Sequence, residues 1–188
     1  GALNDDAFIG KSADWSEAGL VRLVMELDTL GASTQFGFHR SGTVKKDVWD
    51  AYEVQFRSPS GNPPRLDLHS VLDNGTGLSI NVLPDQFDDE KSFPVAAAAK
   101  GCVNGSSFGG EATMTWPALR NLPDEWGVSL KDTDTGESVS LRDTTAYTFQ
   151  LESSACSKAA TTAKSSNAST GERPPVPKPS VNGFSTTT

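Results

Sequence analysis

The sequence predicts an all-β fold: an antiparallel β-sandwich of the jelly-roll or immunoglobulin-like kind, with about nine or ten short strands and a disordered or extended C-terminal tail. Apolar and polar residues alternate over short runs, which is typical of half-buried strands. Turn residues, mainly Gly, Asp, Asn and Pro, interrupt these runs roughly every eight to twelve residues. Long segments with the spacing of an amphipathic helix are absent from the sequence.

The first long apolar segment, residues 14–30, fits either a helix or a strand, because its leucines and valines also have helical spacing. Gly19 inside the run and Gly31 just after it favour a strand of about eight residues. Residues 2–12 are expected to form either a loop or a short edge strand. Other short strands are expected at residues 33–39, 51–56, 65–72, 78–83, 93–99 and 111–116. The turn at residues 73–77 predicts a hairpin. Residues 93–99 are expected to form an edge strand, and Pro117 is expected to end the strand at residues 111–116.

Residues 121–151 predict a closing meander of three strands. Val128 and Leu130 alternate with polar residues before a turn at residues 134–136, and a second alternating run follows. After a polar turn at residues 142–145, a third run ends at Leu151. Because an isolated two-stranded ribbon is only marginally stable, this meander must belong to a larger sheet.

The chain divides into a β-sandwich domain at residues 1–152 and a Ser/Thr/Pro-rich linker or tail at 153–188. The large apolar side chains of the tail are Val176, Val181 and Phe184. So few apolar groups cannot offset the entropy lost on ordering 36 residues. Residues 173–179 are rich in proline, which favours an extended, semi-rigid spacer.

The charge balance excludes some partner classes. The net charge is −8, which argues against nucleic acid and against anionic membrane surfaces. No apolar run approaches the roughly 20 residues that a membrane span requires, so membrane insertion is not expected. The chain begins Gly1-Ala2-Leu3, which indicates a processed product or an internal segment of a longer protein.

The two cysteines, Cys102 and Cys156, match no zinc or redox motif. Both lie in loop-like sequence, and we expect them to form a disulfide, with two unrelated thiols as the alternative. The disulfide would close a loop of about 54 residues and stabilise the fold by about 4 kcal/mol in the chain-entropy model. This expectation agrees with a secreted or cell-surface location.

No catalytic motif is present, and the sequence predicts neither an enzyme nor a cofactor. His39 and His69 are the two histidines, and neither lies in a nucleophile motif. The carboxylates at residues 85–90 cluster in one loop, whereas glycoside hydrolysis needs two carboxyl groups facing each other across a cleft.

An acidic turn at Asp132, Asp134 and Gly136 offers oxygen ligands at alternate positions, as a calcium loop does. It lacks the twelve-residue loop of an EF-hand. A hairpin turn held by Asp and Thr side chains explains the same residues without a metal, and we favour that interpretation.

Carbohydrate binding would require exposed aromatic rings beside polar groups. Trp15, Trp49 and Tyr52 lie in loop or strand-end sequence and are the candidate ligand-binding aromatics. Trp116 follows the apolar alternation of its strand, which places it in the core.

The order of several short motifs resembles the β-sandwich region near the C-terminus of cargo proteins of the type IX (Por) secretion system in Bacteroidetes-like bacteria. The motifs are Phe36-Gly37-Phe38, Asp47, Asp50-Ala51-Tyr52, Pro63-Pro64, Leu83-Pro84, Ala112–Trp116, Leu122-Pro123 with Trp126, Leu130 with Asp132, Thr135-Gly136, Leu141-Arg142, and Tyr147 with Phe149. The resemblance implies a non-catalytic module and supplies no catalytic residue. In that family a short sorting domain follows, and residues 153–188 do not match one.

The function predicted first is a non-catalytic, secreted β-sandwich module of a larger cell-surface or extracellular protein, with a structural or adhesive role. A carbohydrate-binding module is one alternative. The other is a self-assembling extracellular filament subunit whose tail docks on a neighbour. The expected partners are neighbouring domains of the same polypeptide or identical subunits, and possible carbohydrate.

Overall fold

A computed structural model of the chain describes residues 17–53, 63–87, 89–104, 106–152 and 181–187. These residues form strands, turns and loops without a helix, so the all-β class is confirmed. Consistent with this, no helix in the described ranges is long and apolar enough to cross a membrane. The strands are β1 (Gly19–Leu27), β2 (Leu30–Phe38), β3 (Ala51–Tyr52), β4 (Arg65–Val71), β5 (Gly77–Leu83), β6 (Lys91–Lys100), β7 (Cys102–Val103), β8 (Ser106–Ser107), β9 (Gly110–Arg120), β10 (Gly127–Lys131), β11 (Ser138–Ser140), β12 (Ala146–Leu151) and β13 (Val181–Thr187).

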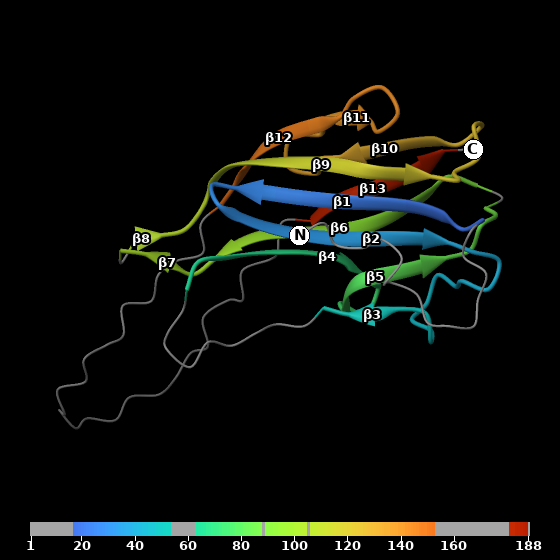
Figure 1. The fold of residues 1–188 in the computed structure, drawn as a ribbon, viewed down its shortest axis with the longest axis horizontal. Helices are drawn as coiled ribbons and strands as arrows, with labels where there is room; N and C mark the ends of the chain where they lie inside the picture. Colours follow the sequence, from blue (N-terminus) through green and yellow to red (C-terminus); the bar gives the residue numbers. More distant parts are fainter. Residues whose placement is uncertain (1–16, 54–62, 88, 105, 153–180, 188) are drawn as a thin grey trace, which may run out of the picture.

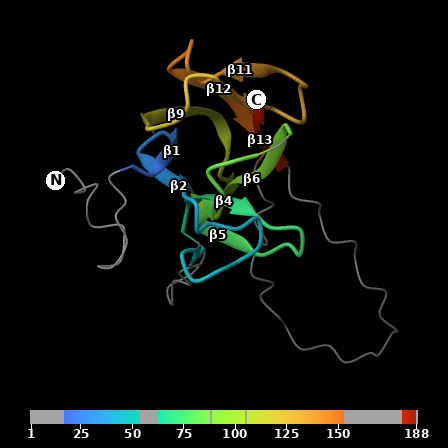
Figure 2. The ribbon, with the colours of Figure 1, turned by 90° about the vertical axis from the view of Figure 1, so that its right-hand side faces the viewer.

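Eleven strands belong to one sheet, in the order β11-β10-β13-β6-β4-β5-β2-β1-β9-β12, with β3 paired to β5. The sheet curls into a half-barrel, which Figure 2 shows nearly end on. The curl brings β12, at one end of the order, into contact with β6. β7 and β8 form a separate small ribbon that projects from one end of the sheet (Figure 1).

The concave side of the sheet holds one hydrophobic core. Residues from both halves of the sheet contribute to it, among them Leu23 and Phe36, which are completely buried. Trp116 and Trp126 are 6% and 5% exposed, so the prediction that Trp116 belongs to the core is confirmed. The indole of Trp116 donates its hydrogen bond to the Thr144 carbonyl at 2.8 Å, which satisfies the polar edge of a buried ring.

β1 and β2 form a long hairpin that settles the ambiguity between helix and strand in residues 14–30. All nine residues of β1 pair with β2, from Gly19 opposite Phe38 to Leu27 opposite Leu30. Side chains along β1 alternate between buried and half-exposed, as in a sheet with one covered face. The two-residue turn places Asp28 at φ 53°, a conformation that short polar residues tolerate.

The strand pairing is mixed, which differs from the purely antiparallel sandwich that was expected. β2 pairs with β5 in parallel, with Gln35 opposite Ile80 and Phe38 opposite Leu83. Residues 39–76 separate these two strands, and only a long connection of this kind allows the chain to return in the same direction. The predicted hairpin at residues 73–77 is confirmed, since β4 and β5 pair antiparallel around a turn with Gly75 at φ 81°.

Pro117 does not end its strand, contrary to prediction. β9 continues to Arg120, and the register with β1 shifts between Arg22 and Val24, opposite the proline. A bulge leaves one residue unpaired, so a proline that lacks an N–H can be accommodated there.

The three-stranded meander predicted for residues 121–151 is only half present. β10 and β11 form the expected hairpin, with Leu130 opposite Val139. β12 instead pairs with β9, from Ala146 opposite Thr115 to Leu151 opposite Gly110. The tight turns were visible in the sequence, but partner choice depends on the curl of the whole sheet.

The largest difference between the prediction and the structure lies at residues 181–187, which were predicted to belong to the linker or tail. They form β13, which lies inside the sheet between β6 and β10. For the same reason β6 is an interior strand and not the edge strand that was predicted for residues 93–99.

Candidate functional site

The seam between β6 and β10 is the feature of the fold with the clearest consequence for function. We use "seam" for the gap that β13 fills, bounded by residues 91–96 of β6 and 127–131 of β10. β13 is antiparallel to both neighbours: Val181 lies opposite Ala96, and Gly127 lies opposite Thr187. Without β13, two strand edges with unpaired backbone groups would face each other across the gap.

The inner wall of the seam is apolar. Phe93 and Val95 of β6 and Val128 and Leu130 of β10 are at most 8% exposed and belong to the core. Phe184 of β13 occupies the register position opposite both Phe93 and Leu130. Position 184 is therefore paired with a buried core residue on each neighbouring strand.

β6 carries a sequence feature that is typical of an edge strand. Pro94 lies opposite Gly183 of β13 and has no N–H to contribute to a ladder. Prolines within sheets are mostly confined to edges and bulges. The prediction of an edge strand at residues 93–99 was wrong, because β6 lies inside the sheet between β13 and β4.

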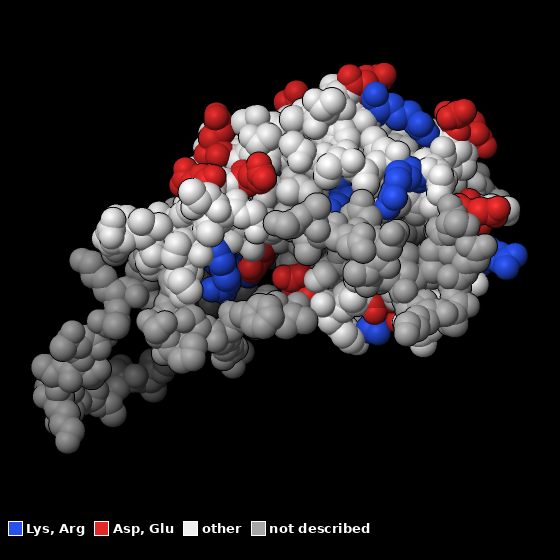
Figure 3. Space-filling view, in the orientation of Figure 1, with Lys and Arg blue, Asp and Glu red and all other residues white. Residues whose placement is uncertain are grey.

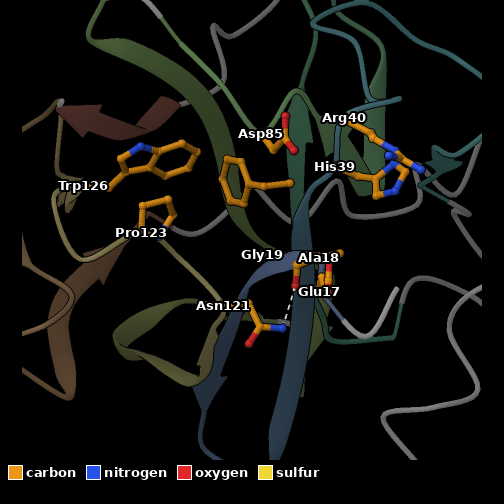
Figure 4. Close-up of a pocket in the computed structure, with 10 residues that line it drawn as sticks. Glu17, Ala18, Gly19, His39, Arg40, Asp85, Asn121, Pro123 and Trp126 are labelled. Atoms are coloured by element: carbon orange, nitrogen blue, oxygen red, sulfur yellow. Dashed lines mark hydrogen bonds between the residues drawn. The ribbon is translucent and has the colours of Figure 1, made fainter. Parts of the chain in front are cut away.

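A second feature is a pocket of about 340 Å³ at one end of the half-barrel (Figure 4). Trp126 and Pro123 lie on one side, His39 and Arg40 on the other, with Asp85 between them. The Asn121 side chain forms part of the wall and donates a hydrogen bond to the Ala18 carbonyl at 3.2 Å. The described lining residues are Glu17, Ala18, Gly19, Phe38, His39, Arg40, Asp85, Asn121, Pro123 and Trp126.

Hydrogen bonds fix two parts of the pocket wall. Nδ1 of His39 accepts the N–H of Ser41 at 3.1 Å, which fixes the ring against its own loop. Arg142 donates hydrogen bonds to the carbonyls of Trp126 and Pro123, at 3.2 and 2.6 Å, and so holds the opposite wall. The described lining contains no Ser, Thr, Cys or Lys that could serve as a nucleophile.

Two of the three candidate ligand-binding aromatics lie close together in the sequence, Trp49 in the loop between β2 and β3 and Tyr52 in β3 itself. Tyr52 is 56% exposed, whereas Trp49 is half-buried, and Trp15 lies outside the described residues. Val44 and Val48 of the same loop are 55% and 88% exposed. The face of the Tyr52 ring is covered by the Lys46 ammonium group at 4.4 Å from the ring centroid, where a stacked sugar would have to displace it.

Asp50 anchors this loop to the sheet. Its carboxylate accepts the N–H of Val82 in β5 at 2.7 Å and the N–H of Asp47 at 2.8 Å. Burial raises the pKa of Asp50 above its ordinary value, although the two N–H donors act in the opposite direction. The exposed apolar side chains of the loop are therefore presented on a fixed backbone.

The acidic turn at residues 132–136 is a hairpin turn, as favoured from the sequence. One Asp132 oxygen accepts the N–H groups of Asp134 and Thr135 at 2.8 and 3.3 Å. The other accepts the Tyr147 hydroxyl at 2.9 Å. Burial alone would raise the pKa of Asp132, but these donors lower it below its ordinary value. In the described ranges no group of His, Cys, Asp and Glu is arranged to hold a metal ion.

His69 of β4 lies beside a buried charge cluster. Asp67 is 5% exposed and pairs with Lys100 at 2.5 Å and with Arg65 at 3.6 Å. Burial lowers the pKa of His69; Glu53 and Asp67 act against this shift, and Lys100 adds to it. The native state therefore holds fewer protons at His69 than the unfolded state does.

Acidification is expected to destabilise the protein through His69. The stability contributed by the neutral ring is lost as the pH falls below the unfolded pKa of about 6.5. The ring is only half-buried, so we expect a drop in Tm of about 1–2 °C between pH 7.5 and 5.5. Differential scanning fluorimetry of the wild type and of His69→Gln measures this. An equal drop in both proteins would assign the effect to other groups.

The predicted disulfide involves one residue that the structure describes. Cys102 is half-buried at the start of β7, whereas Cys156 lies outside the described residues. The pairing of Cys102 with Cys156 therefore stays a prediction.

Charged side chains are scattered over the visible face of the molecule (Figure 3). Carboxylates form several separate groups, and the basic side chains of the described residues lie between them as small patches. This distribution agrees with a net charge of −8 and does not outline a single binding site.

Sequence reasoning missed the seam. A signal was present: Val181 and Phe184 are large apolar residues in an otherwise small and polar tail, and Pro94 interrupts a strand that is otherwise apolar. Neither signal identifies the strand that pairs with residues 181–187, because pairing depends on contacts that are distant in sequence.

Comparison with known proteins gives no relative for this fold or for these sites. No family model, no curated protein and no solved structure matches the chain.

Proposed function

We propose that this chain is a non-catalytic, secreted structural module of a cell-surface or extracellular protein, and that its C-terminal strand completes its sheet. The observation that carries the proposal is the position of β13 between β6 and β10, at the far end of a long connection from β12. A module whose last strand closes the core is suited to linking domains or subunits mechanically.

The described polar groups support a structural role. Asp50 anchors a loop, Asp132 holds a turn, and Asp67 forms ion pairs. In the pocket near Trp126, Arg142 donates to the Trp126 carbonyl and Asn121 to the Ala18 carbonyl, and these bonds hold parts of the wall in place. No triad or carboxylate pair emerges among these contacts as a catalytic centre.

The proposed extracellular location rests on the sequence. The resemblance to type IX secretion cargo, the expected disulfide and the Ser/Thr/Pro-rich segment support it. In that family the corresponding region is a β-sandwich module, and the curled sheet with one core is the feature of this chain that is comparable. We propose the same secretion class here.

An adhesive contribution is favoured by the loop between β2 and β3. Val44 and Val48 of this loop and Tyr52 of β3 are exposed, and Asp50 anchors the segment to β5. Exposed apolar side chains are suited to contact with another protein surface. Carbohydrate binding has less support, because Lys46 covers the Tyr52 ring.

Hydrogen exchange tests the proposal directly. If β13 fills the seam, the amides of β6 and β10 that point toward it should exchange as slowly as those of β1 and β9. Gly183→Pro removes an N–H from the centre of β13 and should accelerate exchange at the seam alone.

Ser185→Ala is the matched control. Position 185 lies opposite the exposed Ser92, so we expect this variant to leave exchange at the seam unchanged. Seam amides that exchange as fast as loop amides in the unaltered protein would contradict the proposal.

A further inference from the structure

We infer that β13 of one copy also fills the seam of a second copy, so that the chain assembles head to tail by strand exchange. This inference rests on the proposed function, in which β13 completes the sheet. The occupant of the seam is then residues 181–187 of a neighbouring molecule.

The first argument is the surplus length of the connection. β12 ends at Leu151 opposite Gly110, where β9 begins. The short β7–β8 ribbon joins the end of β6 to that same point, and β12 contacts β6 directly. The end of β12 and the start of β13, opposite Ala96, therefore lie toward the same end of the sheet.

A connection over such a span ordinarily needs about two to six residues. Residues 152–180 supply 29, which would reach about 100 Å if fully extended. A folded domain of this size is about 40 Å across by the usual scaling of chain length with radius. The connection is thus long enough to place β13 in the seam of an adjoining molecule.

The composition of the connection supports the same conclusion. Prolines stand at positions 174, 175, 177 and 179, immediately before β13. Proline at this density favours an extended chain of about 3.1 Å per residue. An extended connection of this kind suits a strand that reaches another molecule better than one that folds back onto its own sheet.

The acceptor strands also have the properties of an edge that is joined from outside. Pro94 of β6 lies opposite β13 and is typical of edge strands. On the other side, β10 ends at the exposed Lys131, and lysine is a residue that protects open edges from indiscriminate pairing. β13 itself carries no charged residue.

Exchange leaves the contacts of the seam unchanged. The same residues pair whether β13 comes from its own chain or from another. The length of the connection and the protein concentration therefore decide between insertion within one chain and insertion between chains. A flexible tether gives its own strand an effective concentration in the millimolar range at most. Exchange should therefore increase when copies are folded together at high concentration. Because donor and acceptor are different surfaces, a head-to-tail contact produces open chains unless the rotation between copies closes a ring.

Cysteine pairs placed across the seam test the inference. Ser185 lies opposite Ser92, and paired residues on neighbouring strands are about 4.5–5.5 Å apart at Cα, which suits a disulfide. Ser92→Cys and Ser185→Cys are made in separate copies with different tags. The copies are unfolded in urea, mixed, refolded at high concentration and oxidised.

We expect a disulfide between the two differently tagged copies, and a ladder of larger species on size-exclusion chromatography. Asp73→Cys, an exposed turn residue, replaces Ser92→Cys as the matched control and should yield no cross-link with Ser185→Cys. The native cysteines are kept in every variant, so this control also reports any nonspecific exchange.

A double variant, Ser92→Cys with Ser185→Cys in one chain, separates the inference from the proposed function. If it cross-links within the monomer while the mixed copies do not cross-link, β13 fills the seam only of its own chain and strand exchange is overturned. If neither forms the bond, β13 does not occupy the seam and the proposed function fails as well.

Discussion

Deletion of residues 178–188 is expected to lower Tm by about 10 °C or more, or to leave the chain aggregated. The deletion removes β13 and opens the seam along its whole length. β13 pairs through six residues with β6 and through five with β10, and all of these pairs are lost. The two exposed edges then offer unpaired backbone groups to any other chain.

The expected size of the effect follows from the core side chains that border the seam. If about 100–200 Å² of apolar surface on Phe93, Val95, Val128 and Leu130 becomes accessible to water, the loss is on the order of 3–5 kcal/mol. Typical domains have a total stability of about 5–15 kcal/mol, so this loss is a large share.

The measurement is a thermal melt followed by circular dichroism, with size-exclusion chromatography for aggregation. A matched control deletes residues 160–169, which removes 10 of the 29 connecting residues and keeps β13. We expect its Tm to change by only about 1 °C, because loop-closure entropy depends weakly on length. A synthetic peptide of residues 178–188 should partly restore Tm to the truncated chain. An unchanged Tm after truncation would show that β13 does not belong to the folded sheet.

The local elements of this fold could be predicted from the sequence because short-range physics determines them. The alternation in β1 identified a strand despite its helical spacing, and the Asp132 turn was predicted with the side chains that build it. The hairpin at residues 73–77 followed from its Asn-Gly turn signal, and Gly75 has the positive φ that such a turn needs.

Pairing between distant segments could not be predicted in the same way. β12 pairs with β9 and not with the predicted meander, and β2 pairs with β5 in parallel. Residues 181–187 form a strand inside the sheet after a long connection. Each of these choices is set by the curl of the sheet and by which core faces remain uncovered. An alternation pattern specifies a strand and its buried face, but it does not specify a partner.

The same distinction explains the candidate sites. Trp49 and Tyr52 were selected as single aromatic residues in a loop, and the structure shows that Lys46 lies against the Tyr52 ring. The seam, in contrast, is made of four core residues and two strand edges that look ordinary in the sequence. Its importance becomes visible only when the strand order is known.

Phe36→Ala is expected to destabilise the protein by about 3–5 kcal/mol. Phe36 is completely buried near the C-terminal end of β2, opposite Val21 of β1 and Asn81 of β5. Its ring lies 6.3 Å from that of Phe93, measured between centroids. Removing the ring would therefore leave a cavity that reaches the β6 side of the core, where the seam begins.

Urea unfolding followed by tryptophan fluorescence measures the loss, and Phe36→Leu should cost less because it leaves a smaller cavity. Tyr52→Ala is the matched control: it also removes an aromatic ring, but from a side chain that is 56% exposed, so the expected change is about 0.5 kcal/mol or less.

The Phe36 variant also tests whether the core and the seam are coupled. If they are, hydrogen exchange at β6 should accelerate in Phe36→Ala more than at β12, because Phe93 belongs to both regions. Equal acceleration throughout the sheet would show that the half-barrel opens as one cooperative unit. A loss below about 1 kcal/mol would mean that Phe36 does not occupy the centre of the core.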